Sequence, residues 1–240
     1  MFLKRHILCL IAAIALSSAT GTVARGQAMN VGFEDISLLM PDGWTFTNNS
    51  NPLGETNWFQ GEVPPFSAQS GSATSYAAAN FCNTGGPVCA AGFGTISNWM
   101  ILPTRTLSSG DTLSFWTRSS ATQFYDRLQV RMSLSGASGD VGATETSVGN
   151  FTALLLDINP TYSAAGYPTA AWTQFNLVLS GIPAATSGRL AFRYFIEDGG
   201  FHGVNGSSIG IDSLVYNPFP EPSSIALVLT GAVLLICRRR

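Results

Sequence analysis

The stretch Arg189-Leu-Ala-Phe-Arg-Tyr-Phe-Ile196 decides the fold. Large apolar side chains occupy every second position from Leu190 to Ile196, and Arg189 and Arg193 fall on the alternate positions. A period of two residues is typical of a β-strand whose two faces meet different surroundings. We therefore expect a strand with one face in a hydrophobic core and with Arg189 and Arg193 directed to solvent.

Similar stretches recur along the chain, separated by segments rich in Gly, Ser, Asn and Pro. No stretch shows a convincing helical period. The further strand candidates are Leu113–Arg118, Arg127–Leu134, Phe175–Leu179 and Ile209–Tyr216. Many strands joined by turn-rich connections predict an all-β fold, an antiparallel β-sandwich of the jelly-roll type.

The N-terminal segment is typical of a secretory signal peptide. Basic residues Lys4, Arg5 and His6 precede the apolar run Ile7–Leu16, and Gly26-Gln27-Ala28 offers a small-x-small cleavage site. Residues 1–28 are therefore predicted to direct export through the Sec translocon and to be removed by signal peptidase. A retained N-terminal helix is the alternative, although an apolar run of this length is short for a membrane span.

The C-terminal segment, residues 218–240, is predicted to be a sorting signal with a short hydrophobic helix. A spanning helix needs ~20 apolar residues, more than the run here provides, and the terminal arginines should stay on the cytoplasmic side. A plain single-pass tail anchor is the alternative. The motif is Pro220, Glu221 and Pro222, the apolar run is Ile225–Ile236, and the basic end is Arg238, Arg239 and Arg240.

This segment resembles the PEP-CTERM sorting signal of exported proteins in Gram-negative bacteria that make extracellular polysaccharide. The residue before the motif is commonly valine in that family and is Phe219 here. The resemblance implies an exosortase partner, a transpeptidase-like membrane enzyme that recognises Pro-Glu-Pro and cuts near it. It also implies an inner-membrane intermediate followed by release to the cell surface or extracellular matrix.

Residues 29–217 form the predicted jelly-roll domain, and seven short motifs in it occur in the order found in the choice-of-anchor J family. The resemblance implies a jelly roll similar to cleaved-adhesin and MAM-like domains, which serve adhesion or carbohydrate contact, and implies no established enzymatic activity. The motifs are Gly32–Glu34, Pro41–Trp44, Trp58–Gly61, Gly71–Phe81, Ile96–Pro103, Leu113–Arg118 and Asp126–Arg131.

The cysteines and the charges of this domain narrow its chemistry. Cys82 and Cys89 are its only cysteines and lie in a Gly/Pro-rich loop, which in an oxidising compartment predicts a disulfide. The domain has no lysine, and its 13 acidic residues against 6 arginines give a net charge of −7. This balance argues against a nucleic-acid partner, because phosphate binding needs a basic patch.

Catalytic motifs are missing from the sequence, which predicts a protein that is not an enzyme. The mature chain has one histidine, His202, and lacks a Gly-x-Ser-x-Gly elbow, a zinc motif and a phosphate loop. We expect His202 to be an ordinary loop residue. A glycoside-active enzyme is the alternative, since two facing carboxylates suffice for that chemistry; the conceivable partners are Glu55, Glu62, Glu197 and Asp198.

Calcium is the one cofactor that the sequence suggests. Jelly-roll adhesin and carbohydrate-binding domains often hold a structural calcium where the first and last strands meet, and calcium takes carboxylate and carbonyl oxygens. Glu34 and Asp35 at the start of the domain and Asp212 in its last strand are the candidate ligands. The alternative is that these carboxylates pair with arginines or cap turns.

The aromatic residues suggest a binding role. We expect the five tryptophans to be core residues and aromatic residues in polar loops to be the contacts for a ligand, in the first place exopolysaccharide. A structural matrix protein without a discrete ligand is the alternative. The candidate contacts are Phe66, Phe93, Tyr125, Tyr162, Tyr167 and Phe201.

Overall fold

The computed structural model describes residues 27–89 and 92–219. The predicted signal peptide and the predicted sorting signal, including Pro220–Pro222 and Arg238–Arg240, lie almost wholly outside the described residues and stay predictions. Gly26–Pro218 form one compact unit. Among the residues that the structure describes, no helix is long and apolar enough to cross a membrane.

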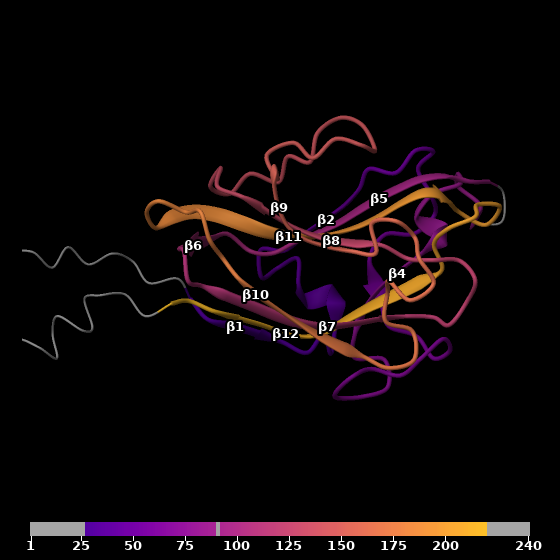
Figure 1. Ribbon diagram of the computed structural model, residues 1–240, viewed down its shortest axis with the longest axis horizontal. Coiled ribbons are helices and arrows are strands. Elements are labelled where there is room, and N and C mark those ends of the chain that lie inside the picture. The colour runs from indigo at the N-terminus through magenta and orange to yellow at the C-terminus, as the bar shows by residue number, and fades with distance from the viewer. Residues whose placement is uncertain (1–26, 90–91, 220–240) are drawn as a thin grey trace, which may run out of the picture. The chain divides into compact units, whose positions relative to one another are not determined.

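Two antiparallel sheets of six strands each make up the domain (Figure 1). The first sheet, called sheet A, has the strand order β10-β7-β12-β4-β3, and β1 also pairs with β12. Its strands are β1 (Met29–Val31), β3 (Phe59–Gln60), β4 (Ala77–Asn80), β7 (Thr112–Ser119), β10 (Thr173–Val178) and β12 (Ser208–Asn217).

The second sheet, called sheet B, has the order β2-β5-β11-β8-β9, and β6 also pairs with β11. Short 3-10 helices, η1 (Ile36–Leu38) and η2 (Phe81–Asn83), lie in the connections. The strands of sheet B are β2 (Thr45–Asn48), β5 (Gly94–Ile101), β6 (Arg105–Leu107), β8 (Leu128–Ser133), β9 (Ala153–Ile158) and β11 (Thr186–Gly199).

The chain crosses repeatedly from one sheet to the other. It passes from β6 in sheet B to β7 in sheet A, returns to β8, and crosses again between β9 and β10, β10 and β11, and β11 and β12. Such crossovers between two packed antiparallel sheets are the jelly-roll arrangement. The predicted all-β jelly-roll sandwich is confirmed.

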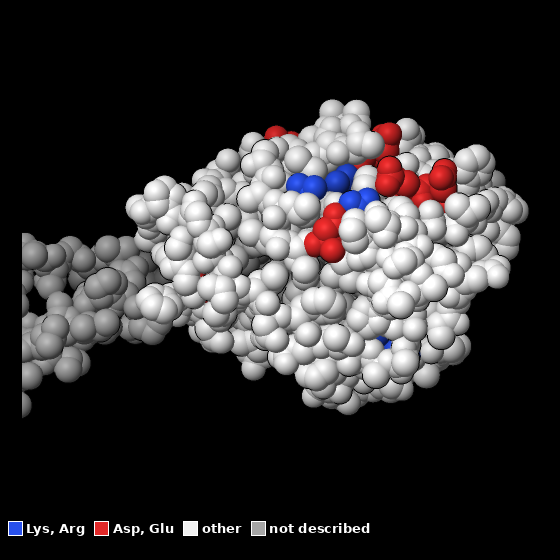
Figure 2. Space-filling view, viewed as in Figure 1, with Lys and Arg blue, Asp and Glu red and all other residues white. Residues whose placement is uncertain are grey.

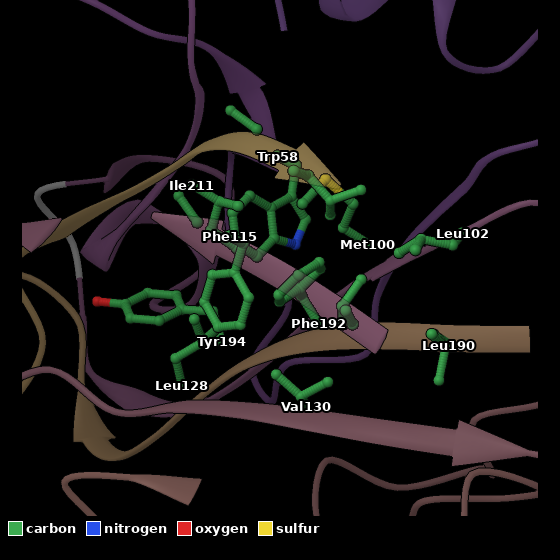
Figure 3. Close-up of a cluster of buried hydrophobic side chains, with 14 of the residues drawn as sticks. Trp58, Met100, Leu102, Phe115, Leu128, Val130, Leu190, Phe192, Tyr194 and Ile211 are labelled. Carbon is green, nitrogen blue, oxygen red and sulfur yellow. The ribbon is translucent and has the colours of Figure 1, made fainter. Parts of the chain in front are cut away.

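The hydrophobic core lies between the two sheets (Figure 3). The alternate positions of β11 that decide the fold, Leu190, Phe192, Tyr194 and Ile196, all point into it and are buried. Phe115 of β7 meets Phe192 edge to face at 4.8 Å between ring centroids. Aromatic rings prefer this geometry, which adds to the free energy gained from burying their area.

Both sheets are also covered on their outer faces. Over sheet B, Val141 and Phe151 from the segment 134–152, called the covering loop, pack on Trp99, Ile101 and Ala191. A second small cluster covers part of sheet A, where Phe66 and Tyr76 pack with Ala78 and with the partly buried Trp172. The sandwich therefore has a core between the sheets and an apolar cluster on each outside.

These covers correct the expectation that Arg189 and Arg193 face solvent. Both side chains do point away from the core, but they are buried, at 5% and 2% exposed. Arg189 donates to the carbonyls of Leu102 and Gly43. Arg193 donates to the carbonyl of Glu145 in the covering loop. The alternation of apolar and polar residues predicted that one face of β11 is exposed to solvent. That face is not exposed because the covering loop packs over it.

The two ends of the described chain lie together at one end of the sandwich. Met29 of β1 pairs with Tyr216 near the end of β12. At its other end β12 begins with Ser208, and the loop 200–207 before it connects it to β11. A strand of this length spans about 30 Å at ~3.3 Å per residue, so this loop lies far from the chain ends (Figure 1).

Candidate functional site

An open groove of about 370 Å³ lies at the loop end of the sandwich. Three phenyl rings and a set of hydroxyl groups line it, with glycines between them. Among the described residues, no charged side chain lines it. The lining residues are Phe81, Ser120, Thr122, Phe124, Gly200, Phe201, Gly206, Ser207 and Ser208.

The rings of this loop-end groove are unusually exposed for their size. Phe201 is 53% exposed and Phe124 is 37% exposed. Phe81 lies 6.2 Å from Phe201 between ring centroids, and the His202 ring meets Phe201 edge on at 5.1 Å. Apolar surface left open beside polar groups in a concavity is the usual character of a ligand site.

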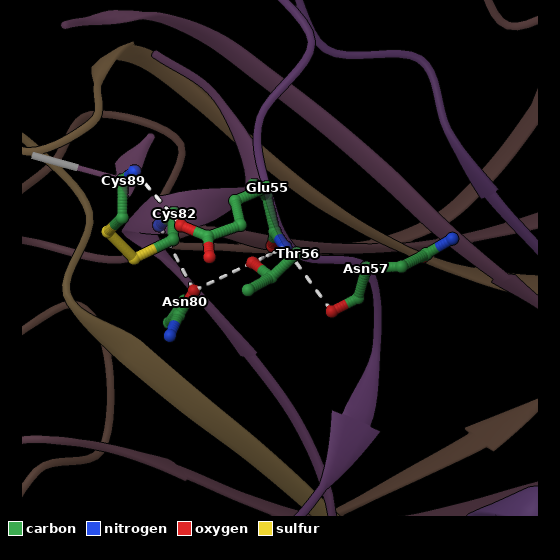
Figure 4. The surroundings of a disulfide bond; sticks show 7 residues. Glu55, Thr56, Asn57, Asn80, Cys82 and Cys89 are labelled. Carbon is green, nitrogen blue, oxygen red and sulfur yellow. Dashed lines mark hydrogen bonds between the residues drawn. A yellow bond between two sulfur atoms is a disulfide. The ribbon is translucent and has the colours of Figure 1, made fainter. Parts of the chain in front are cut away.

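The disulfide predicted from the sequence, Cys82–Cys89, is present and holds one wall of the groove (Figure 4). Cys82 follows Phe81 within η2, and the Asn80 side chain caps η2 by accepting the Cys82 N–H at 3.0 Å. The Glu55 carboxylate accepts the Cys89 N–H at 3.0 Å. The covalent link and these bonds fix the backbone that presents the Phe81 ring.

A close approach of two backbones fixes the opposite wall. Gly200 has φ +99, and a Cβ at this position would lie 2.8 Å from both the Gly92 carbonyl oxygen and the Phe93 Cα. Only glycine tolerates this conformation and this contact together. Because the His202 N–H also donates to the Gly92 carbonyl, the segment after Gly200 is held against the start of β5, with Phe201 turned into the groove.

A buried carboxylate supports the groove from behind. Asp126 is 1% exposed and accepts bonds from the Ser207 N–H, the Ser207 hydroxyl and the Tyr194 hydroxyl, at 2.8, 2.5 and 2.6 Å. Burial raises the pKa of Asp126 above its usual value, although the bonds from Ser207 and Tyr194 act to lower it. The network fixes the position of Ser207 and so of the groove floor.

Three of the six predicted contact residues come to this end of the molecule. Phe201 lines the groove, and Phe93, 60% exposed, lies against Gly200 beside it. The carbonyl of Tyr125 accepts the Gly206 N–H, which places the Tyr125 backbone at the groove edge.

The other three predicted contacts lie elsewhere. Phe66 and Tyr167 are buried, at 6% and 4% exposed, which corrects the expectation that they are surface contacts. Phe66 belongs to the outer cluster of sheet A, and Tyr167 belongs to the core, where its hydroxyl pairs with Thr117. Tyr162 is partly buried, and its hydroxyl accepts the Glu197 N–H.

The expectation that all five tryptophans are core residues is confirmed for three of them and corrected for two. Trp44, Trp58 and Trp99 are buried. Trp116 and Trp172 are only partly buried. Trp116 alternates along β7 with the buried Phe115, so it points to the outer side of sheet A rather than into the core.

Of the lining residues, sequence reasoning found Phe201 alone, and it missed the rest together with Asp126 behind them. Phe124 satisfies the criterion applied to its neighbour Tyr125, since both lie in a polar loop, and it could have been found in that way. Phe81 carries no such signal, because its position depends on the fold of the disulfide loop. Asp126 stands at the start of a strand motif, and only the tertiary structure shows that it is buried behind Ser207.

The residues considered for catalysis have local structural contacts. Glu55 accepts from Cys89 N–H, and Glu197 lies 3.5 Å from the Arg127 guanidinium. Asp198 has φ +53, and its carbonyl accepts the Val204 and Asn205 N–H groups in the loop before β12. Glu62 is exposed, and its carbonyl accepts from the Tyr76 hydroxyl.

Most of the charged side chains on the face shown in Figure 2 gather in one patch that contains both signs of charge. The Arg127 guanidinium forms a two-bond pair with Asp157, at 2.9 and 2.7 Å. Burial, followed by repulsion from Arg131 and Arg127, lowers the pKa of Arg193 to about 9. Among the described residues every arginine is at least partly buried, although some arginine atoms reach the surface (Figure 2), whereas several acidic residues are exposed.

Two of the three candidate calcium ligands contact the same segment, and the third lies apart from them. Asp212 is fully buried and accepts the N–H groups of Gln69 and Ser70 at 2.8 and 3.1 Å. Glu34 accepts from the Ser75 hydroxyl, so both carboxylates contact the segment 69–75. Asp35 instead caps η1 through the Ser37 N–H at 2.9 Å. Within the described part of the chain, no three His, Cys, Asp or Glu residues form a metal-binding group.

No protein-family model matches the chain, and no curated protein matches it. Among solved structures, the K1 cleaved adhesin domain of Lys-gingipain from Porphyromonas gingivalis W83 is similar at TM-score 0.54 and 21% identity, covering 81% of this chain and 100% of that chain. The K2 cleaved adhesin domain of Lys-gingipain is similar at TM-score 0.50 and 16% identity, covering 80% and 99%. At these identities the likeness shows the fold: this chain has the β-sandwich architecture of cleaved adhesin domains.

Proposed function

We propose that this protein is an exported, non-catalytic binding domain whose loop-end groove contacts carbohydrate of the extracellular matrix. The observation that carries the proposal is the groove itself, in which exposed rings of Phe124 and Phe201 lie beside the hydroxyls of Ser120 and Thr122. Sugar rings have apolar C–H faces that pack on aromatic rings and hydroxyls that need polar partners. The likeness to cleaved adhesin domains is in keeping with an adhesive role.

The position of the groove supports display on a surface. The described chain begins and ends at the β1–β12 end of the sandwich, where Met29 pairs with Tyr216. Ser207 and Ser208 of the groove lie at the other end of β12. A tail that continues from Phe219 would therefore hold the domain by the end opposite its groove, and the groove would face away from the attachment.

Binding can be tested by electrophoresis of the purified protein through native gels that contain polysaccharide. The test polymers are the exopolysaccharide of the bacterium that makes the protein and a panel of soluble glucans. We expect the wild type to be retarded and Phe201→Ala to migrate freely. Leu154→Ala is the matched control, since Leu154 is 48% exposed on β9 and away from the groove, and it should bind as the wild type.

Three results would oppose the proposal. Equal retardation of Phe201→Ala and the wild type would place the binding outside the groove. A wild type that no polysaccharide retards, but that self-associates in an ordered way, would favour a structural matrix protein. Release of reducing sugar that stops in Glu197→Gln or Asp198→Asn would make the protein an enzyme.

We also propose that the C-terminal segment is a PEP-CTERM-type signal that an exosortase removes, and that the domain belongs with choice-of-anchor J proteins. The support is the order Pro220–Pro222, apolar run and Arg238–Arg240 in the sequence. Mass spectrometry of the exported protein should find its C-terminus near Pro220–Pro222. An intact Arg240 on the exported protein would contradict processing.

Calcium bound near Glu34 and Asp212 is a further part of the proposal. Asp212 is a buried carboxylate, and among the described residues no arginine pairs with it. Burial raises its pKa, and a divalent cation would offset the cost of burying the charge. Glu34 and Asp212 would hold it, and its chemistry would be structural. A melting temperature that chelator leaves unchanged, with no calcium by metal analysis, would disprove this.

A further inference from the structure

The hydroxyl groups of the loop-end groove have a fixed hydrogen-bond polarity when the Asp126 carboxylate is ionised. The Ser207 hydroxyl donates to Asp126 Oδ2 at 2.5 Å, and the Ser120 hydroxyl donates to Ser207 Oγ at 2.9 Å. A hydroxyl has one proton to donate and two lone pairs. Because each proton is directed inward along the chain Ser120–Ser207–Asp126, the Ser120 oxygen presents lone pairs to the groove.

Several other donors around the groove are also occupied within the protein. The Thr122 hydroxyl donates to the Phe124 carbonyl at 3.2 Å. The backbone N–H groups of Ser120, Gly206 and Ser207 donate to Ser208 O, Tyr125 O and Asp126. Within the described part of the chain, the Ser208 hydroxyl is the lining hydroxyl that has no recorded partner and can still donate. The groove is therefore mainly a hydrogen-bond acceptor.

The charges around the groove also disfavour an acidic ligand. No arginine lines the groove among the described residues, and Asp126 lies directly behind Ser207. The exposed Glu197 and Asp198 precede the loop that carries Phe201. A carboxylate or sulfate group has no proton to donate to the Ser120 oxygen. The chain Ser120–Ser207–Asp126 offers such a group no free donor, and no cation lies among the described residues of the groove lining to neutralise its charge.

We propose that the groove selects a neutral polysaccharide, one that donates hydroxyl protons to Ser120 and packs apolar C–H faces on Phe201 and Phe124, and that it rejects acidic polysaccharides. This selectivity rests on the proposed function, because it assigns the substrate class of the same groove. It follows from the orientation of the Ser120–Ser207–Asp126 chain, which a buried carboxylate sets at its inner end.

The test compares polymers that share a backbone and differ in charge. Hydroxyethylcellulose is paired with carboxymethylcellulose, and dextran with dextran sulfate, and the purified full-length protein is run in gels at low salt and at about 0.5 M salt, where long-range repulsion is screened. We expect the neutral member of the bound pair to bind at least about tenfold more tightly than its acidic partner, a difference of about 1.4 kcal/mol, at both salt concentrations.

Two variants probe the hydroxyl chain. Ser120→Ala removes the outermost acceptor and should weaken neutral binding several-fold. Asp126→Asn should place its amide oxygen toward the Tyr194 hydroxyl and the Ser207 N–H, and its NH2 group toward Ser207 Oγ. The chain would then run outward, Ser120 would donate to the groove, and the preference for the neutral polymer should shrink.

The outcomes separate the selectivity from the proposed function. Acidic polymer bound as tightly as neutral polymer, and lost in Phe201→Ala, would overturn the selectivity while a carbohydrate site remains. Unchanged neutral binding by Ser120→Ala would likewise overturn it. If neither member of any pair binds and the polysaccharide of the source bacterium does not bind, both proposals are wrong.

Discussion

Single residues set the geometry of the groove, and Gly200 is the most demanding of them. A Cβ at Gly200 would collide with the backbone of Gly92 and Phe93, whereas Gly86, at a similar φ of +98, has nothing within 4 Å. Both Gly→Ala changes carry the same penalty for a positive φ, of about 1–2 kcal/mol. Only Gly200→Ala adds a collision between two backbones.

We therefore predict that Gly200→Ala lowers the free energy of unfolding more than Gly86→Ala does, and that it alone weakens polysaccharide binding. Urea unfolding and gel retardation of the two variants measure the two effects. Equal losses of stability would show that the contact between Gly200 and the start of β5 does not matter in solution.

Asp126 links the groove to pH. Burial raises its folded-state pKa above the ordinary 3.8, so its contribution to stability is fully present below pH 3.8 and is lost as the pH rises through the folded pKa. The neighbouring Tyr194 and Tyr167 stay protonated, since burial raises the pKa of each. We predict that the free energy of unfolding of the wild type, relative to Asp126→Asn, falls as the pH rises above about 4.

Urea unfolding of both proteins across this range measures the difference. Asp212 is common to both proteins, so its own titration cancels in the comparison. A difference that instead grows with pH would mean that the bonds from Ser207 and Tyr194 lower the pKa of Asp126 more than burial raises it.

At the scale of elements, the segments outside the sheets explain what the sequence could and could not predict. The period of two in β11 predicted both the strand and the inward direction of Phe192 and Tyr194. It could not show that the covering loop buries Arg193, because a loop 50 residues away in sequence carries no periodic signal. Phe66 failed as a surface contact for the same reason, since it covers sheet A.

The candidate site, too, could be predicted from the sequence only in part. The criterion of aromatic residues in polar loops selected Phe201, which lines the groove, but it also selected Phe66 and Tyr167, which are buried. The groove needs three separate connections to meet, namely η2, the loop after β7 and the loop before β12. Their meeting depends on strand order, which local residue patterns do not encode.

The covering loop is predicted to depend on Arg193. The Arg193 guanidinium packs on Trp99 and Phe195, 4.9 and 4.0 Å from the ring centroids, and donates to the Glu145 carbonyl. Arg193→Met keeps apolar contact with the rings but loses this bond and the bonds of the guanidinium to two side chains of sheet B. Loss of the bond should cost about 1–3 kcal/mol, and amide hydrogen exchange in residues 134–152 should become faster.

Arg118→Met is the matched control on the other sheet. Arg118 lies over the Phe66 ring at 4.7 Å and donates to the Thr169 carbonyl. The Arg118→Met variant should change amide hydrogen exchange near Phe66 and leave the exchange of residues 134–152 unaffected. Unchanged exchange of the covering loop in Arg193→Met would show that apolar packing by Val141 and Phe151 is sufficient to hold it.

The whole domain, residues 29–217, combines a lysine-free sequence with arginines that all lie in or next to strands. Arg105, Arg118, Arg131, Arg189 and Arg193 lie in strands, and Arg127 directly precedes β8. Proteases need several residues of extended, accessible chain, which a paired strand does not offer. We predict that trypsin makes no cut within residues 27–219 of the native protein.

Chymotrypsin provides the comparison, because Phe93 and Phe201 are exposed in or beside loops. It should cut there under conditions in which trypsin does not. Mass spectrometry of the fragments identifies the sites. Tryptic cleavage after Arg127 or Arg131 in native protein would contradict the tight pairing of β8 with its neighbours.

The central claim is that the loop-end groove, at the end of the sandwich opposite the chain ends, is where a polysaccharide binds. Hydrogen exchange of the purified protein, with and without a saturating polysaccharide that retards it, tests this directly. The account predicts new protection confined to Phe81, residues 119–125 and residues 199–208. Protection on the outer faces of the sheets, with these segments unchanged, would contradict it.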